Sequence, residues 1–565
     1  MPTWLIVVLL GILAAAGNIG RAQERVTPPP TRLPATEDTV QTGREQQDAG
    51  PELELPEVLI LGEDRAVRVR DEKVSPVSTS LTLLHPELTT QLVEYQFLLQ
   101  ERKPYYQQFS RRYDQRFWSM VQGGTYSSLL GRAGYWRTSP ERSYMIEGRV
   151  DYTEGQYFNS QHTFGRISAG AEFILSPGSS VYFKPEFRRD EYGLFGAEDS
   201  TAERAASQGG MRVEYRYESG ERSAAGAQVE VWGYGAESDL QGNQPSTSDL
   251  WMDASGRYSL RWANVDVTGG ARFVRERTKF FGDSLRLHRS FGEARLESGF
   301  RLSPGMNGEF GVTYQYLKTD SGDGTGRLAP RGRINVLPGP KIGISLELYS
   351  GYKFNTYSDL ADENRYAAHR IILAPDEVLY GLRTQLELQP AEGLTVGGTV
   401  GYNQMEREHF WTRDSLQGLF KRNSVEDVNV VELTLFSSIE AWGWMQFHGE
   451  VIAYSALYDQ DSPHSDREFI PYRPTLRIPV DVSIRLPWHL TARLDGEFVG
   501  ARETSLTNGR VLNQYILLGA QLERSFGEHF MLRAGTRNVL NHEYAEWRNY
   551  PETGRQWFLG LEVKL

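Results

Sequence analysis

The segment Met211-Arg212-Val213-Glu214-Tyr215-Arg216-Tyr217-Glu218 carries the pattern that decides the fold. Apolar or aromatic residues alternate with charged ones, which is the period of a β-strand with one dry and one wet face. The end of the chain repeats the pattern, with Leu559, Leu561, Val563 and Leu565 alternating with Phe558, Gly560, Glu562 and Lys564. A soluble sandwich or propeller would have to bury such charges or expose such apolar rows. The alternation therefore favours a closed transmembrane barrel, with lipid outside and water inside.

Ten short turn signals divide the chain into hairpins at roughly forty-residue intervals. Alternating sequence flanks each signal, and the opposite end of each hairpin is usually a longer, more charged segment. Tight turns at one end and long loops at the other are typical of outer-membrane β-barrels. The signals are Ser139-Pro140, Ser176-Pro177-Gly178, Ser219-Gly220, Trp262-Ala263-Asn264, Ser303-Pro304-Gly305, Leu337-Pro338-Gly339-Pro340, Pro390-Ala391-Glu392-Gly393, Trp442-Gly443, Leu486-Pro487-Trp488 and Phe526-Gly527.

The pattern predicts an all-β fold, a transmembrane antiparallel β-barrel of about twenty-two strands over residues 118–565. An even number of strands leaves both ends of the barrel in the periplasm. Four tryptophans at tight turns predict a periplasmic aromatic girdle; they are Trp262, Trp442, Trp444 and Trp488. The predicted strands lie near 118–126, 129–138, 143–153, 163–175, 180–189, 207–218, 222–235, 250–261, 264–277, 285–302, 307–318, 327–336, 342–355, 377–389, 394–408, 427–440, 445–457, 471–485, 489–502, 511–524, 529–541 and 555–565.

Composition excludes several classes of protein. Of the 565 residues 39% are hydrophobic, and the formal net charge is −12. Outside the N-terminus no apolar run approaches the ~20 residues that a spanning helix needs. The acidic balance argues against nucleic acid as a partner, because nucleic-acid binding calls for basic patches. Cysteine is absent, which excludes a disulfide framework, a lipobox and thiol chemistry.

The N-terminal residues indicate export. Residues 1–22 have the character of a signal peptide, with a short apolar core from Leu5 to Ala16 and small residues at Gly20-Arg21-Ala22, although no Lys or Arg precedes the core. Residues 23–56 are rich in Pro, Thr, Gln and acidic groups, and predict a disordered periplasmic tether. We therefore expect a protein of the outer membrane of a Gram-negative-type bacterium.

Two features lie between this tether and the barrel. Glu57-Val58-Leu59-Ile60-Leu61-Gly62 is a β-prone patch in polar surroundings. It is either a short edge strand or a segment that adds to a partner's sheet. Residues 87–103 change to a helical period, and Pro86 and Pro104 suit the ends of a helix. The apolar face of this helix, Leu88, Leu92, Tyr95 and Leu99, should rest against the periplasmic mouth or the interior of the barrel.

No motif indicates catalysis, so we predict neither an enzyme nor a metal or cofactor site. The ten His residues show no ligand spacing. Asp320-Ser321-Gly322-Asp323-Gly324 lacks the further oxygen donors of a calcium loop and favours a solvated hairpin loop. The charged stretch from Glu406 to Asp427 is interpreted as a surface loop, either simply solvated or ligand-binding.

The final segment, Arg537-Asn538-Val539-Leu540-Asn541-His542-Glu543-Tyr544 through Pro551 to Leu561, resembles the C-terminal end of TonB-dependent receptors. A second similar stretch is Leu373-Ala374-Pro375-Asp376-Glu377, followed by Pro390-Ala391-Glu392-Gly393-Leu394. The resemblance covers residues 118–565 and implies a barrel of twenty-two strands. The barrel-closing strand would carry Trp557, Leu559, Leu561, Val563 and Leu565.

The resemblance also gives a meaning to Glu57, Val58, Leu59, Ile60 and Leu61, which are similar to a TonB box, the segment that a periplasmic energy-transducing protein binds by strand pairing. The sequence departs from the family in its plug domain. Only residues 63–117 lie between box and barrel, so this extension is at most a reduced plug. The lumen would then be closed by the helix of residues 87–103 with its tail, by infolded extracellular loops, or by another polypeptide.

Three functions follow. The leading one is a transport barrel that binds or translocates a solute, with energy coupling left open by the missing plug. The second is a non-transporting scaffold or assembly barrel whose lumen is filled by a partner, and the third is a passive porin-like channel. The expected partners are outer-membrane lipid and the barrel assembly machinery, together with a TonB-like periplasmic protein or a lumen-filling polypeptide.

Overall fold

The computed structural model describes residues 117–565 except for short gaps at 140–141, 220–221, 241–243, 263–264, 282–284, 304, 321, 323, 415–416, 442, 459–466 and 508. The predicted signal peptide, the tether, the TonB-box-like residues Glu57 to Leu61 and the helix of residues 87–103 lie outside the described residues.

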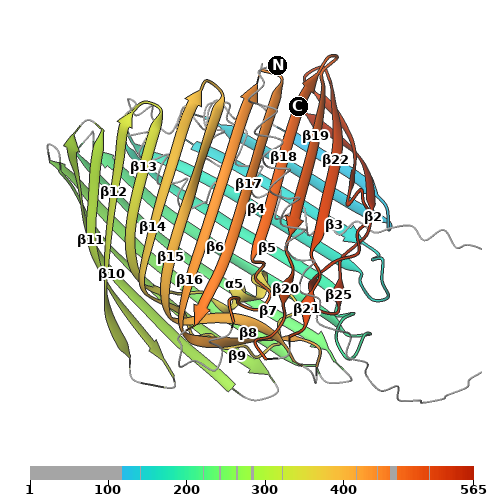
Figure 1. The fold of residues 1–565 in the computed structure, drawn as a ribbon, viewed down its shortest axis with the longest axis horizontal. Helices are drawn as coiled ribbons and strands as arrows, with labels where there is room; N and C mark the ends of the chain where they lie inside the picture. The colour runs from blue at the N-terminus through green and yellow to red at the C-terminus, as the bar shows by residue number, and fades with distance from the viewer. Residues whose placement is uncertain are drawn as a thin grey trace, which may run out of the picture. The chain divides into compact units, whose positions relative to one another are not determined.

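Twenty-two strands form a single antiparallel sheet (Figure 1). Their number and type confirm the predicted fold class. The strands are β1 (Phe117–Gly124), β2 (Ser128–Thr138), β3 (Arg142–Thr153), β4 (His162–Ser176), β5 (Ser179–Gly193), β6 (Glu203–Ser219), β7 (Ser223–Asp239), β8 (Ser246–Trp262), β9 (Val265–Phe281), β10 (Leu285–Ser303), β11 (Met306–Thr319), β12 (Thr325–Gly339), β13 (Ile342–Lys353), β14 (Asp376–Ala391), β15 (Leu394–Arg413), β16 (Phe420–Ala441), β17 (Met445–Tyr458), β18 (Leu476–Leu486), β19 (Leu490–Val499), β22 (Tyr515–Phe526), β23 (Phe530–Arg537) and β26 (Gln556–Lys564).

The sheet closes on itself. Each strand pairs with its neighbours along the chain, and β26 pairs with β1 so that Leu561 lies opposite Val121. The backbone of Phe117 exchanges hydrogen bonds with that of Leu565, with N···O distances of 3.0 and 2.8 Å. Closure leaves no free sheet edge, which is the condition for a sheet to cross a lipid bilayer.

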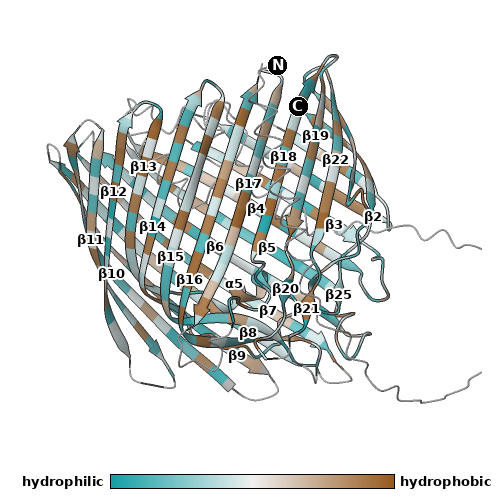
Figure 2. Cartoon of the chain, viewed as in Figure 1, coloured by the Kyte–Doolittle hydropathy of each residue, from teal (hydrophilic) through white to brown (hydrophobic). Residues whose placement is uncertain are grey.

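The two faces of the wall follow the alternation in the sequence. On β26, Leu559 is 58% exposed whereas Phe558 is 7% and Glu562 8% exposed. On β6, Met211 lies on the outside at 46% exposure. Figure 2 shows hydrophobic and hydrophilic residues alternating along the strands. The outside of the wall is thus apolar and the inside polar, as a membrane-spanning barrel requires.

The ten turn signals lie where they were predicted, between an even-numbered strand and the next strand of the sheet. Trp262 and Trp488 at these turns are 86% and 81% exposed, and Trp444 is also exposed, which fits an aromatic girdle. Trp442 lies outside the described residues.

At the opposite end several strands, β15 and β16 above all, run further than predicted, whereas β18, β19, β22 and β23 stop short of their predicted bounds. β15 and β16 continue to Arg413 and begin at Phe420, so the stretch from Glu406 to Asp427 is mostly a strand pair and the prediction of a surface loop there is wrong. The physical reason is that Phe410 and Trp411 are both buried, each in a different hydrophobic cluster, so this part of the strand pair is packed and not solvated. Charged residues in this stretch concealed the alternation.

The connections at this end contain short elements that the sequence did not predict. They are α5 (Tyr357–Glu363), β20 (Arg502–Glu503), β21 (Val511–Leu512), β24 (Ala545–Trp547) and β25 (Tyr550–Pro551). A capping box begins α5, because the Thr356 side chain accepts from the backbone N of Asp359 and the Asp359 side chain accepts from the backbone N of Thr356. No helix among the described residues is long and apolar enough to cross a membrane.

Candidate functional site

Loops from around the ring meet in one hydrophobic cluster, which we call the loop cap. They are the β5–β6, β13–β14, β15–β16, β17–β18 and β23–β26 connections. Figure 1 shows α5 at the same end of the barrel as β20, β21 and β25. The cap contains Leu194, Ala197, Tyr357, Leu360, Tyr366, Ala367, Ala368, Ile371, Leu373, Trp411, Leu419, Phe420 and Tyr550, with Tyr472 and Trp547 packed against them.

Residues 354–375, the β13–β14 loop, cross the lumen within this cap. Asp362 of α5 accepts from Arg188 of β5 at 2.5 Å, and the hydroxyl of Tyr192, also on β5, donates to the carbonyl of Arg365 at 2.6 Å. Strands β5 and β13 lie eight positions apart in the ring of 22 strands, so the loop reaches across most of the lumen. An infolded loop, one of the three closures left open by the sequence, is therefore present at this end of the barrel.

An ion pair on the wall clamps both stems of this loop. Arg289 of β10 and Glu276 of β9 are 3% and 1% exposed, and the Arg289 Nε donates to the Glu276 carboxylate at 2.6 Å. Arg289 also donates to the carbonyls of Asn355 and Leu373, at the two ends of the loop. The second carboxylate oxygen of Glu276 accepts from the backbone N of Tyr357 at 2.7 Å. Such extra hydrogen bonds are the condition under which the attraction within a buried ion pair can repay its desolvation cost.

Two further buried arginines hold the loop from other parts of the wall. Arg204 of β6 donates to the carbonyls of Arg365 and Ala367 at 3.0 and 2.7 Å. Arg422 of β16 donates to those of Ile372 and Ala374 at 3.1 and 2.8 Å. Strands β6, β10 and β16 thus fix the backbone of a loop that itself begins at β13. The loop is built as a fixed part of the lumen and not as a freely hinged lid.

The loop also contributes a charged side chain, Arg365, to an ion pair with the wall. Arg365 donates to the Asp190 carboxylate of β5 at 2.8 Å, and His162 of β4 contacts the other oxygen of Asp190 at 2.6 Å. Burial disfavours the charge on Arg365, but Asp190 outweighs burial and raises the pKa of Arg365 above its ordinary value. Arg365 therefore stays charged at any physiological pH.

Aromatic rings tie the loops to one another. Tyr366 and Tyr550 stack with ring centroids 3.7 Å apart, and both side chains are buried. Phe420 packs edge-on against Trp547 at 4.9 Å. Burial raises the pKa of Tyr366 well above its usual value, so its hydroxyl stays neutral. The β13–β14 and β23–β26 loops are therefore packed directly against each other through Tyr366 and Tyr550.

Comparison with known proteins identifies the architecture. No protein-family model matches the chain, and no curated protein matches it in sequence. The FrpB iron transporter from Neisseria meningitidis superposes with a TM-score of 0.67 at 10% identity, over 81% of this chain and 83% of its own. The siderophore receptor PiuA from Acinetobacter baumannii gives 0.64 at 9% identity, over 80% and 81%. The ferric enterobactin receptor from Pseudomonas aeruginosa gives 0.62 at 11%, over 80% and 81%. The fold is that of a TonB-dependent receptor barrel.

The receptor-like C-terminal stretch forms the loop that leads into the closing strand. Asn538 and Asn541 have φ values of 45° and 52°, a left-handed conformation that asparagine tolerates better than most residues. The Asn538 amide donates to the carbonyls of His542 and Thr553, at 2.9 and 3.2 Å. The Asn541 side chain accepts from the backbone N of Arg555 at 2.8 Å. The motif therefore shapes the loop from β23 to β26.

The second receptor-like stretch lies at the exit of the crossing loop. Leu373 is buried in the cap and its carbonyl accepts from Arg289. Asp376 accepts from His409 at 2.6 Å and from Arg422 at 3.1 Å. Leu373 and Asp376 are thus anchor points at the exit of loop 354–375, a role that their order in the chain did not reveal, whereas Pro390 to Leu394 form the tight turn between β14 and β15.

The site residues predicted from the sequence fall in two groups. Trp557, Leu559, Leu561 and Leu565 are exposed on the outside of the barrel at β26 and the chain end, with Val563 partly exposed beside them. Glu57, Val58, Leu59, Ile60 and Leu61 lie outside the described residues. Sequence reasoning missed Arg204, Arg289 and Arg422, because arginine at every second position is ordinary for a wall that faces water.

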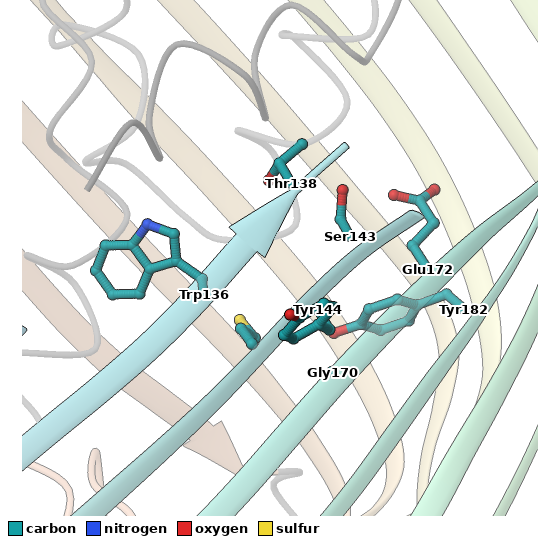
Figure 3. A pocket seen from close by; sticks show the side chains of 8 residues that line it. Trp136, Thr138, Ser143, Tyr144, Gly170, Glu172 and Tyr182 are labelled. Atoms are coloured by element: carbon teal, nitrogen blue, oxygen red, sulfur yellow. The ribbon is translucent and has the colours of Figure 1, made fainter. Parts of the chain in front are cut away.

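A separate recess lies on the wall of β2 to β5, near the tight turns (Figure 3). It holds about 310 Å³ of space that is partly open to solvent. Trp136, Met145 and Tyr182 give it an apolar lining, and Glu172 adds a carboxylate. Gly170 leaves the space that the Tyr182 hydroxyl occupies, since a Cβ there would lie 2.9 Å from that oxygen. Its lining residues belong to no part of the loop cap.

Among the described residues no three His, Asp or Glu side chains gather in a way that could hold a metal ion.

Proposed function

We propose that this chain is an outer-membrane receptor barrel that binds a solute at its loop end and admits it through a lumen restricted by residues 354–375. The fold supports the receptor part of the proposal. The restriction of the lumen is supported by the crossing loop, because the buried pair Arg289 and Glu276 holds both of its stems. A cylinder of 22 strands without filling would otherwise be a wide hole.

Planar-bilayer conductance of the purified full-length protein tests the restriction. We expect little steady current from the wild type and a large current when residues 357–372 are replaced by a Gly-Ser linker. A large steady current through the wild type would contradict the proposal and favour a passive channel. Silence of both proteins would mean that something other than this loop closes the lumen, such as residues 63–117.

Energy coupling is a separate part of the proposal. The TonB-box-like residues Glu57 to Leu61 would bind a TonB-like periplasmic protein by strand addition. Deletion of these five residues should abolish accumulation of solute in cells, whereas deletion of residues 45–49 in the predicted tether should not. Equal uptake by both deletion variants would remove energy coupling and leave the barrel itself untouched.

The first solutes to test are iron–siderophore complexes, because the similar structures carry the names of an iron transporter and of siderophore receptors. Binding to detergent-solubilised protein can be followed by tryptophan fluorescence, since Trp411 and Trp547 lie in or against the loop cap. Absence of binding by all such complexes would exclude this class of ligand.

A scaffold that transports nothing is the second candidate. The observation that favours it is the number of buried polar contacts on the crossing loop, which resist opening. It predicts a wild type that is silent in the bilayer, takes up no solute in cells and copurifies with a partner polypeptide in stoichiometric amount.

A further inference from the structure

The outer wall carries a group of cations at the loop side of β9, β10 and β11. Arg275, Arg277 and Lys279 follow one another at every second position of β9. The residues between them face the lumen, since Val274 and Glu276 are each 1% exposed. Arg275 and Arg277 are exposed and Lys279 is partly exposed, so the three cations project from the outside of the barrel.

The strand register places two more cations, Arg286 and Lys318, beside these three. Arg286 of β10 lies opposite Lys279, and Ser290 of β10 pairs with Arg275 on one side and Lys318 of β11 on the other. Both Arg286 and Lys318 are exposed. We call these five residues the outer cation group: Arg275, Arg277, Lys279, Arg286 and Lys318.

These charges have no counterions in the described part of the chain. None of the five makes an ion pair or a side-chain hydrogen bond with another described residue. Arginines on the lumen side of the same strands are paired, for example Arg272 with Asp253 and Arg295 with Glu293, both at 2.7 Å. The carboxylate of Asp320 lies near the group, and one of its oxygens accepts a hydrogen bond from the backbone N of His288 at 2.7 Å.

The group lies at the edge of the apolar belt. Directly below it, Gly292 of β10 pairs with the exposed Phe273 and Tyr316 of the neighbouring strands. Arg275 is ten residues along β9 from Val265, which begins the strand at the tight-turn end. At ~3.4 Å per residue and a tilt of about 40°, this is about 25 Å along the membrane normal, the height of the apolar band of such barrels. The cations therefore lie at the level of lipid headgroups.

We infer that the outer cation group binds the phosphate groups of a phosphorylated lipid in the membrane leaflet on the loop side. Lipid-facing cations are destabilising at the bilayer midplane but tolerated at the interface, where they attract anionic headgroups. The guanidinium fork matches phosphate geometry in two-point hydrogen bonding. A lipid fits better than a soluble partner, because the cations stand on the wall immediately above side chains that contact acyl chains.

Native mass spectrometry of the full-length protein, with purified lipopolysaccharide as the phosphorylated lipid and phosphatidylcholine as the neutral one, tests the inference. The variant R275Q/R277Q/K279Q removes the cations of β9. The matched control R137Q/R142Q/R524Q removes three outward cations at the tight-turn end. At roughly fivefold in affinity for each cation near an anionic surface, the first variant should bind lipopolysaccharide about a hundredfold more weakly than the wild type. The control should stay within about threefold.

Several outcomes would overturn the inference. They are equal affinity of the wild type and the β9 variant, equal loss in both triple variants, and displacement of the lipid by millimolar inorganic phosphate. The conservative variant R275K/R277K should keep most of the affinity if charge is what matters. Heat-modifiable migration in gels confirms that each variant is folded, so a loss of binding cannot be ascribed to a missing barrel.

Discussion

The two ends of the barrel are built on different principles. At the tight-turn end contacts within a few residues help to close the connections, as where the backbone N of Ser139 donates to the carbonyl of Arg142 at 2.8 Å. At the loop end the decisive contacts join distant parts of the chain, as between Tyr192 and Arg365, which are 173 residues apart. Local contacts help to shape one end, whereas the contacts of the other end join residues that only the closed wall brings together.

This difference separates the stability of the wall from that of the cap. The wall is a continuous ladder of backbone hydrogen bonds, and lipid supports it from outside. The cap depends on a few buried side chains from β6, β10 and β16. It should therefore be possible to open the cap while the wall remains intact.

The sharpest test of this separation is R289M. It leaves Glu276 buried without its counterion and removes the donors to Asn355 and Leu373. Breaking a buried ion pair by removing one partner costs about 3–5 kcal/mol, and we expect that loss to fall on the cap. The steady conductance should rise, and protease should cleave residues 357–372 while the barrel still migrates as folded.

R295M is the matched control on the same strand. Arg295 also faces the lumen and pairs with Glu293 at 2.7 Å, but it is more than a third exposed and touches no loop. An exposed pair contributes only about 0–1 kcal/mol, so conductance and protease resistance should stay as in the wild type. Equal effects of the two substitutions would mean that the clamp at Arg289 has no special role.

Y550A probes the contact between loops. The side chain is fully buried against Tyr366, and removal of a buried aromatic ring costs about 3–5 kcal/mol. We expect the lower end of that range, because neighbouring loops can partly close the cavity. Urea denaturation in detergent, followed by tryptophan fluorescence, should show an early transition of the cap before the wall unfolds.

Y550F separates the ring from its hydroxyl. The Tyr550 hydroxyl is buried and has no hydrogen-bond partner in the described part of the chain. The phenylalanine variant should therefore be as stable as the wild type or slightly more so. A loss as large as that of Y550A would show that the hydroxyl, and not the stacking, holds the loops.

The same difference explains what the sequence could predict. Most strands of the wall were predictable to within a few residues, because inward-facing and outward-facing residues alternate along the sequence of each strand. In β26 this alternation runs from Gln556 to Lys564. The tight turns were predictable because glycine and proline mark them. The extra length of β15 and β16 was not, because charged residues continue past the lipid on strands that still pair.

There is a physical reason why the loop cap could not be predicted from the sequence. Arg204, Arg289 and Arg422 look like any luminal arginine until the closed ring brings loop 354–375 against them. The capping box at Thr356 and Asp359 is a local signal that could have revealed α5. The seven residues of α5, about two helical turns inside a stretch interpreted as a loop, were too few to give a helical period.

His369 gives the cap a predicted dependence on pH. Its Nε2 lies 2.8 Å from the Ser238 hydroxyl and its Nδ1 lies 3.0 Å from that of Thr247. Burial, with the nearby charge of Arg204, lowers the pKa of His369 to about 2. The unfolded loop takes up a proton near pH 6.5, whereas the folded loop does not. Stability is therefore fully present above about pH 6.5 and is lost as the pH falls below it.

At pH 5 this linkage amounts to about 2 kcal/mol, because each pH unit below 6.5 is worth about 1.4 kcal/mol. Hydrogen exchange of residues 366–372 at pH 7 and at pH 5 measures it. H369Q should remove most of the pH dependence, since glutamine does not titrate, while a variant at the exposed His529 should leave it unchanged. Equal hydrogen-exchange protection of the cap at both pH values would contradict a lowered pKa of His369.

The smallest effect is expected at the tight-turn end, from G443A. Gly443 has a φ of 69°, and a Cβ added there would meet nothing within 4 Å. The cost is therefore only that of a left-handed conformation for alanine, about 1 kcal/mol. G393A is the informative partner, because Gly393 has a φ of 72° and its new Cβ would clash with the carbonyl oxygen of Glu440. Urea titration should rank G393A as the more destabilised barrel. Conductance should stay at the wild-type level in both variants, because a strained turn weakens the wall locally and leaves the loop cap, at the far end of the strands, in place.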